Sequence, residues 1–215
     1  MKVKQLLNKG MTILFQGDSV TDCWREHTPD GLGDGYAQMV SQACGALCRD
    51  MDLKFVNRGV SGNRCRNLLE RYEKDILQVK PDILSILVGI NDTWRCFDSD
   101  DACSIERFES EYRTLLDRVK KDLPACKLIL MQPFLLHTLP DQWAWREDLD
   151  AKATLVSRLA REYKAMYIPL QGMFDQLVTG GIDPADLSQD GVHPTALGHR
   201  YIAIEYMKML GILDK

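Results

Sequence analysis

The sequence has no excess of basic residues and no long run of hydrophobic ones. Its 27 lysines and arginines are outnumbered by 31 aspartates and glutamates, for a formal net charge of −4. Proteins that bind nucleic acid need a positive surface, so the sequence predicts no nucleic-acid partner. The N-terminal stretch 1–16 contains only a short apolar run, too short for a signal peptide or a membrane span. These absences favour a soluble cytoplasmic protein without membrane association.

Cysteine motifs and phosphate loops are also missing. The seven cysteines form no CxxC pair, and an odd number without a signal peptide favours free thiols over a disulfide framework. Cys44 and Cys48 are four residues apart, but no histidine or acidic residue stands at ligand spacing, and structural zinc needs four ligands. No glycine-rich loop of the dinucleotide or Walker type is present. The sequence therefore predicts neither a metal nor a cofactor.

Apolar runs alternate with amphipathic segments along the whole chain. The expected strands are 12–15, 53–56, 82–88, 127–131 and 166–168. The expected helices are 35–49, 68–79, 105–119, 149–163, 170–178 and 195–210, with loops at 94–103 and 180–194. This alternation predicts a three-layer α/β fold with a doubly wound, five-stranded parallel sheet of flavodoxin-like order 2-1-3-4-5. Without a repeat or linker to divide it, the chain 1–215 is interpreted as a single domain.

Polar segments follow three of the strands, and a fourth lies near the C-terminal end. They are Gly17-Asp18-Ser19, Ser61-Gly62-Asn63, Gly89-Ile90-Asn91-Asp92 and Asp190-Gly191-Val192-His193. Because the carboxyl ends of parallel strands meet at one edge of a sheet, we expect these segments to converge. Ser19 then serves as nucleophile and His193 as its base, oriented by Asp190. The backbone N–H groups of Ser19 and Gly62, with the Asn91 side-chain amide, can surround a developing oxyanion.

With these segments the sequence resembles the SGNH hydrolases, also called GDSL-type esterases. The four blocks of that family occur in order over 13–199, and its Ser, Gly, Asn and His stand here as Ser19, Gly62, Asn91 and His193. Val20 stands where the name of the family has Leu, at a position that varies among its members. The bacterial intracellular carbohydrate acetylesterases, including the acetylxylan esterases, are the most similar branch. That narrower resemblance rests on 15–22, 57–64 and 86–95.

The resemblance implies a serine esterase that removes O-acetyl groups from carbohydrates such as xylo-oligosaccharides. The reaction passes through an acyl-serine intermediate and uses no cofactor, and the partner is a small acetylated saccharide. The resemblance also implies a homo-oligomer. The last expected helix is apolar on more than one side, so either both sides are buried within the domain or one meets another subunit.

Aromatic and basic residues beside the motifs are candidate substrate contacts. The four tryptophans, at 24, 94, 143 and 145, lie in segments that follow strands, and none stands on a predicted core face of a helix. Flat rings suit the apolar faces of sugars, although they could equally seal loops or an oligomer interface. Arginine side chains next to the motifs could bind substrate hydroxyls or pair with aspartates at 98, 100 and 101. The substrate-binding candidates are Trp24, Arg64, Trp94 and Arg95.

Several other polar residues have a simpler interpretation. Asp18 is expected to stabilise the turn that carries the nucleophile, and Asp92 is interpreted in the same way. Cys23 and Cys65 are interpreted as packing residues, because neither has an adjacent histidine to activate a thiol. His199 is expected on the surface of the last helix, whereas His27 and His137 fall in loops at the edge of the sheet that carries the motifs.

Two other functions remain open. A lysophospholipase or acyl-thioesterase with the same four blocks needs a long apolar acyl groove, and only 134–136 in the expected loops is apolar enough to form one. A non-catalytic flavodoxin-like binding module would explain the sheet. It would leave Ser19, Asn91, Asp190 and His193 without a role.

Overall fold

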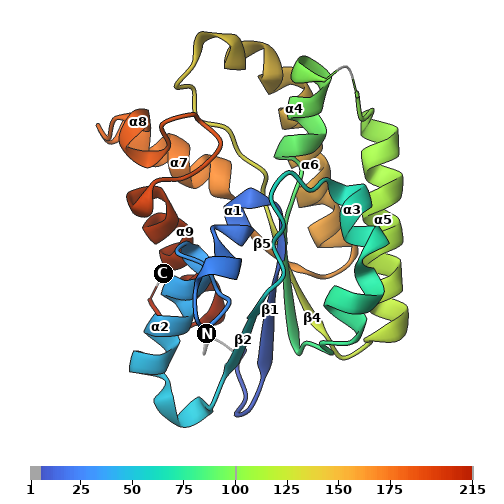
Figure 1. Cartoon of the computed structure of the whole chain (residues 1–215), viewed down its shortest axis with the longest axis vertical. Helices are drawn as coiled ribbons and strands as arrows, with labels where there is room; N and C mark the ends of the chain where they lie inside the picture. Colours follow the sequence, from blue (N-terminus) through green and yellow to red (C-terminus); the bar gives the residue numbers. More distant parts are fainter. Residues whose placement is uncertain (1–5, 100, 215) are drawn as a thin grey trace.

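The structure is a computed structural model that describes residues 6–99 and 101–214. Its centre is a parallel sheet in the order β2-β1-β3-β4-β5, with helices on both faces (Figure 1). The strands are β1 (Thr12–Gly17), β2 (Lys54–Asn57), β3 (Ile83–Leu87), β4 (Lys127–Met131) and β5 (Met166–Ile168). The predicted three-layer α/β fold and its strand order are confirmed.

Alternate residues of the central strands face opposite helical layers, because successive side chains of a strand point to opposite faces. Ile13 and Phe15 of β1 pack in one core with α2, α7 and α9, whereas Leu14 packs in the other core with α3, α5 and α6. Figure 1 shows these two groups of helices on either side of the sheet. The helices are α2 (Tyr36–Leu47), α3 (Cys65–Glu70), α5 (Ile105–Asp122), α6 (Arg146–Glu162), α7 (Leu170–Thr179) and α9 (Ala196–Leu210).

The segment after β3 forms a helix, α4 (Ile90–Asp98), so the loop expected over 94–103 is wrong for its first part. The sequence favours a turn at Asp92, directly after the strand. Asn91 and Asp92 lie instead in the first turn of α4, which follows Gly89 at φ +136°. In that turn the Thr93 hydroxyl donates to Asp148 Oδ2 over 2.6 Å, which ties α4 to α6.

Two other expected segments also differ from the structure. The helix expected over 68–79 is divided into α3 and a π-helical turn, Glu73–Leu77. The loop expected over 180–194 contains a short helix, α8 (Pro184–Leu187). The Asp183 side chain caps this helix by accepting from Ala185 N over 2.9 Å, and Pro184 occupies its first position, which are ordinary helix-start signals.

The last helix, α9, is largely accounted for by packing within the chain. It contacts α2, α8 and β5, and Ile202, Tyr206 and Leu210 are buried. The Thr195 hydroxyl caps it by accepting from Gly198 N over 3.3 Å. No helix in the described ranges is long and apolar enough to cross a membrane.

Candidate active site

The turn between β1 and α1 (Ser19–Asp22) presents Ser19 at the carboxyl edge of the sheet. Gly17 is required there because a Cβ atom would lie 2.4 Å from the Leu87 carbonyl oxygen. Asp18 is buried and accepts from Val20 N over 3.0 Å, the turn-stabilising contact expected from the sequence. Burial raises the pKa of Asp18 to about 7, against the lowering effect of the Val20 N–H. Ser19 thus begins α1 directly after a buried residue that caps this helix.

The structure brings Ser19, His193 and Asp190 into one hydrogen-bonded chain. Ser19 Oγ lies 2.8 Å from His193 Nε2, and His193 Nδ1 lies 2.6 Å from Asp190 Oδ2. The carboxylate can accept only from a protonated Nδ1, which leaves Nε2 of the neutral ring free to accept the Ser19 proton. This is the geometry that activates a serine hydroxyl.

Asp190 is held by its own loop. Its Oδ1 accepts from the backbone N–H groups of His193 over 2.7 Å and Val192 over 3.0 Å, and from the Ser188 hydroxyl over 3.2 Å. Partial burial disfavours the ionised carboxylate, but the hydrogen bonds from the His193 side chain and from these N–H groups outweigh it and lower the pKa of Asp190. The carboxylate therefore stays ionised where it orients the imidazole.

Gly62 and Asn91 lie on the same cavity as Ser19. Gly62 has φ +79° with open space around it, a conformation that suits a backbone N–H close to a bound ligand. Among the described residues, neither the N–H of Ser19 nor that of Gly62 has a hydrogen-bond acceptor. The Asn91 side-chain amide donates one hydrogen to the Asn63 carbonyl over 3.2 Å, and its second hydrogen is available to a ligand. Three donors thus border the space in front of the Ser19 hydroxyl.

The cavity has a volume of about 640 Å³ and a mixed polar and aromatic wall. Besides the residues already described, it is lined by Val20, Asp22, Cys23, Trp24, Glu26, His27, Ser61, Trp94, Arg95, Pro194 and His199. It therefore includes three of the four substrate-binding candidates. Trp24 is 69% exposed, and Trp94 lies beside the catalytic candidate His193 with their ring centres 6.1 Å apart.

Arg64 does not line this cavity, so its assignment as a substrate contact is corrected. It is 3% exposed, and its guanidinium donates to the Asp101 carboxylate over 2.7 Å and to the Asp101 carbonyl over 2.9 Å. Arg95 pairs with Asp98 while its guanidinium lies 5.3 Å from the centre of the Trp94 ring. The expected pairing with nearby aspartates is thus found for both arginines. Asp100 lies outside the described residues.

Two of the four tryptophans are not at the cavity. Trp145 is buried against Ile90, Leu149 and Val192, although it stands on no core helix face that the sequence predicts. Trp143 is 68% exposed and stacks on His137, with ring centres 3.7 Å apart. Trp145 thus belongs to a small core cluster, and Trp143 to the outer surface.

His199 is not a surface residue, as the sequence suggested, but a buried one. Its Nδ1 accepts from Tyr36 N over 3.3 Å, and its Nε2 lies 3.4 Å from Cys23 Sγ. Because Nδ1 accepts, the proton of the neutral ring is on Nε2 and is donated to the sulfur. His199 therefore cannot take the proton of the Cys23 thiol, whose pKa is raised by burial. Cys23 has the histidine neighbour that the sequence did not reveal, but the pair is not arranged as a thiol nucleophile.

The environment of His199 predicts a stability effect at acidic pH. Burial, aided by the charge of His193, lowers the pKa of His199 to about 4 from its ordinary value of 6.5. The unfolded chain therefore binds more protons than the folded one between these values, and folding loses stability as pH falls through this window. His199→Asn retains an acceptor for the Tyr36 N–H but does not titrate.

We expect His199→Asn to have a lower free energy of unfolding than the wild type at pH 8. Because only the wild type loses the His199 contribution on acidification, the difference between the two free energies should decrease by about 3 kcal/mol from pH 8 to pH 4. Denaturant titrations of both proteins at several pH values measure this gap. Because Asp18 and the other titratable groups are common to both proteins, their contributions largely cancel in the difference. A gap that does not change with pH would contradict the assignment.

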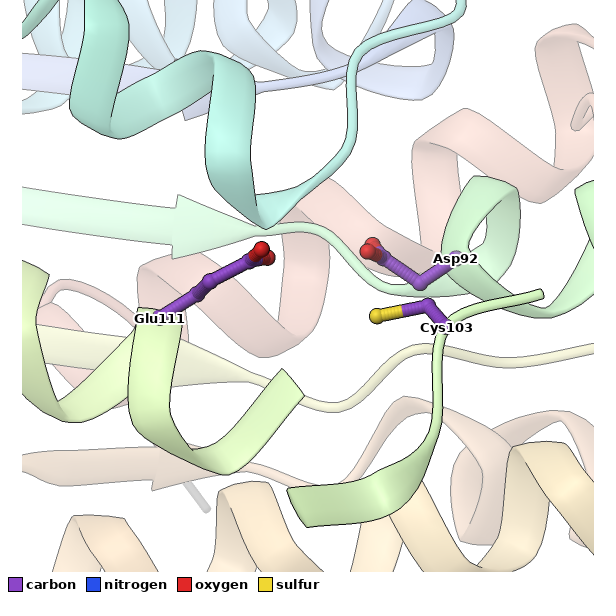
Figure 2. Close-up of side chains that lie close together, drawn as sticks. All are labelled: Asp92, Cys103 and Glu111. Atoms are coloured by element: carbon purple, nitrogen blue, oxygen red, sulfur yellow. The ribbon is translucent and has the colours of Figure 1, made fainter. Parts of the chain in front are cut away.

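One group of potential metal ligands lies outside the lining of the cavity. Among the residues that the structure describes, the ligand atoms of Asp92, Cys103 and Glu111 lie within 4.8 Å of one another, and Figure 2 shows the three side chains pointing together. Both carboxylates already face guanidinium groups: Asp92 Oδ1 is 3.6 Å from Arg64 Nε, and Glu111 Oε1 accepts from Arg107 Nε over 2.8 Å. Three ligands in this cationic setting fit an ion-paired cluster better than a zinc site.

Comparisons with known proteins agree with this geometry. The profile of the GDSL-like Lipase/Acylhydrolase family matches residues 15–201. The chain belongs to this family. It is therefore a carboxylic ester hydrolase, and the non-catalytic binding module is set aside.

Individual relatives of this GDSL-family protein are acetylxylan esterases and related hydrolases. An acetylxylan esterase of Geobacillus stearothermophilus is 33% identical over 95% of this chain and 96% of its own. A crystal structure of an acetylxylan esterase from that organism superimposes with a TM-score of 0.87 at 31% identity, over 95% of this chain and 96% of the other. An alpha/beta hydrolase enzyme from the metagenome of Lake Arreo has a TM-score of 0.89 at 28% identity, over 98% and 100% of the two chains.

Proposed function

We propose that this esterase removes O-acetyl groups from short acetylated carbohydrates, such as xylo-oligosaccharides, through an acyl-serine intermediate. The observation that carries the proposal is the hydrogen-bonded chain Ser19–His193–Asp190, which opens onto a cavity shared with Gly62 and Asn91. Two solved structures of the Geobacillus stearothermophilus enzyme are catalytic mutants, one with a histidine and one with an aspartate replaced by alanine. The same residue types carry the reaction proposed here.

The reaction has two halves, and His193 transfers the proton in both. His193 Nε2 accepts the proton of Ser19 Oγ as this oxygen bonds to the acetyl carbonyl carbon. The negative charge that develops on the carbonyl oxygen is stabilised by the N–H groups of Ser19 and Gly62 and by the Asn91 amide. The bond to the sugar oxygen then breaks, and His193 gives this oxygen its proton. Water repeats the sequence on the acyl-serine and releases acetate, so the kinetics are ping-pong.

The cavity wall favours an acetylated sugar over a lipid or a long-chain acyl ester as the substrate. Trp24 and Trp94 offer flat aromatic surfaces, which suit the apolar faces of sugar rings, and Asp22, Glu26 and Arg95 offer partners for hydroxyl groups. A long acyl chain would need an apolar groove. The one apolar run that could have formed it, Phe134-Leu135-Leu136, is buried and does not line the cavity. We therefore rank a lysophospholipase or thioesterase second.

Two further expectations are carried forward as part of the proposal, namely a homo-oligomer and a cytoplasmic location. Support for the first comes from large apolar side chains that are exposed on the single chain, including Phe97, Leu139 and Trp143.

Hydrolysis of p-nitrophenyl esters from acetate to octanoate tests the proposed substrate class. We expect kcat/KM to fall roughly 10- to 100-fold from acetate to octanoate, because forcing extra methylenes against a packed wall costs about 1–3 kcal/mol. Acetylated xylo-oligosaccharides should then be deacetylated by the same preparation. Maximal activity on the longer esters would instead support the lysophospholipase or thioesterase.

A further inference from the structure

The carboxylate of Asp92 connects two of the three elements that supply the oxyanion donors. Asp92 follows Asn91 in the first turn of α4, but its side chain does not line the cavity and is fully buried. Its Oδ2 accepts from the backbone N–H of Cys65 over 3.2 Å, and its Oδ1 lies 3.6 Å from Arg64 Nε. Both partners follow Gly62 within three residues, so one side chain joins the Gly62 segment to the start of α4.

The segment that carries Gly62 is fixed at its other end by a second carboxylate. Asp22 Oδ2, on α1, accepts from Ser61 N over 3.1 Å and from the Ser61 hydroxyl over 2.7 Å. Since α1 also begins with Ser19, the segment 61–65 is bonded to the nucleophile element on one side and to the Asn91 element on the other. Gly62 itself has the freedom of a glycine at positive φ. These two carboxylate contacts limit its position, together with the hydrogen bonds of Asn63 to Asn91 and Val60.

We infer that Asp92 is a positioning residue of the oxyanion site, which sets the distance between the Gly62 N–H and the Asn91 amide together with the hydrogen bond from Asn91 to the Asn63 carbonyl. The inference rests on the proposed serine mechanism. It accounts for a buried carboxylate that the mechanism itself does not use. A donor displaced by about 1 Å can cost a 100-fold loss of rate, so fixing this distance has a large effect on the transition state.

The charges around Asp92 keep its carboxylate suited to this task at neutral to basic pH. The charges of Arg64 and Lys152 favour its ionised form, and the charge of Glu111 disfavours it. Cys103 and Glu111 lie beside it in Figure 2. Burial is the largest influence and raises the pKa of Asp92 to about 6, despite the Cys65 N–H, Arg64 and Lys152. Kinetic tests are therefore made at pH 8, where the carboxylate is ionised in the wild type.

Asp92→Asn is the variant that tests the inference, and Glu111→Gln is its matched control. Both replace a carboxylate of the cluster in Figure 2 by an amide, but Glu111 lies on α5, and none of its hydrogen bonds in the described residues involves the Gly62 segment. For p-nitrophenyl acetate we expect Asp92→Asn to lower kcat about 10- to 100-fold with KM within about twofold of the wild type. Glu111→Gln should leave kcat within about twofold.

A double variant separates positioning from general damage. If Asp92 acts through the oxyanion donors, Asp92→Asn should cost at least about three times less in an Asn91→Ala background than in the wild type, because coupled residues are not additive. If Asp92→Asn does not fold, Arg64→Lys keeps the charge but loses the guanidinium contact with Asp92, and the same pattern is expected of it.

A wild-type kcat in Asp92→Asn would overturn the inference. So would an equal loss of kcat on Asp92→Asn in the wild type and in the Asn91→Ala background. If activity is lost in Ser19→Ala and Asn91→Ala but kept in Asp92→Asn, the Asp92 inference is wrong and the proposed mechanism stands. If activity is kept in Ser19→Ala, the proposed mechanism itself is wrong.

Discussion

Replacing Ser19 with alanine is expected to lower kcat for p-nitrophenyl acetate by about 10⁶-fold, the scale of loss when a serine nucleophile of this kind is removed. The expected loss follows from the geometry, since Ser19 Oγ is the only atom of the hydrogen-bonded chain that can form the acyl bond, with His193 Nε2 2.8 Å away to take its proton. Steady-state kinetics of the purified variant at pH 8 measure the effect.

The Ser19 variant needs a control that makes the same chemical change elsewhere. Ser110→Ala serves this purpose, because Ser110 is exposed on α5 and no residue of α5 lines the cavity. It should keep wild-type kcat and thermal stability, and Ser19→Ala should keep the same stability without the activity. Turnover within about tenfold of the wild type in Ser19→Ala would contradict the proposed mechanism.

Replacing Asn91 with alanine is expected to lower kcat by about 10²- to 10³-fold, the usual effect of removing one oxyanion donor. The KM should change only a few-fold, because the amide contacts the carbonyl oxygen most strongly when it becomes negative. Asn91 is 3% exposed and its amide already donates to the Asn63 carbonyl, so its second hydrogen is held in a fixed direction. The separate measurement of kcat and KM tests this claim.

Asn91→Asp provides the sharper comparison at the same position. It keeps the size of the side chain but replaces the donor by a negative charge, so it should be less active than Asn91→Ala. An Asn91→Asp enzyme more active than Asn91→Ala would show that the amide is not an oxyanion donor, as would an Asn91→Ala kcat within about threefold of the wild type.

The layers of the fold could be predicted from the sequence because each strand is a short apolar run. The expected strands at 127–131 and 166–168 coincide with β4 and β5, and their alternation with helices implies parallel pairing and right-handed connections. The start of α4 was missed because Asn91 and Asp92 favour turns as strongly as first helical turns. What decides between the two is the contact of α4 with α6, which sequence patterns do not reveal.

The convergence of the polar segments could also be predicted, since it follows from the parallel strands. Individual side chains could not be placed in the same way. Arg64 stands two residues after Gly62, yet its side chain does not line the cavity and pairs with Asp92 and Asp101. His199 is buried because its side of α9 faces Tyr36 and Cys23, which belong to elements more than 160 residues earlier. Such orientations depend on tertiary packing, to which local patterns are insensitive.

The most direct test of the central claim is to label the nucleophile with a sulfonyl fluoride and to locate the label by mass spectrometry of peptides. The account predicts one sulfonyl group per chain, on Ser19, formed in step with the loss of esterase activity and formed far more slowly in His193→Ala. A label on any other residue, or inactivation that leaves Ser19 unmodified, would contradict it.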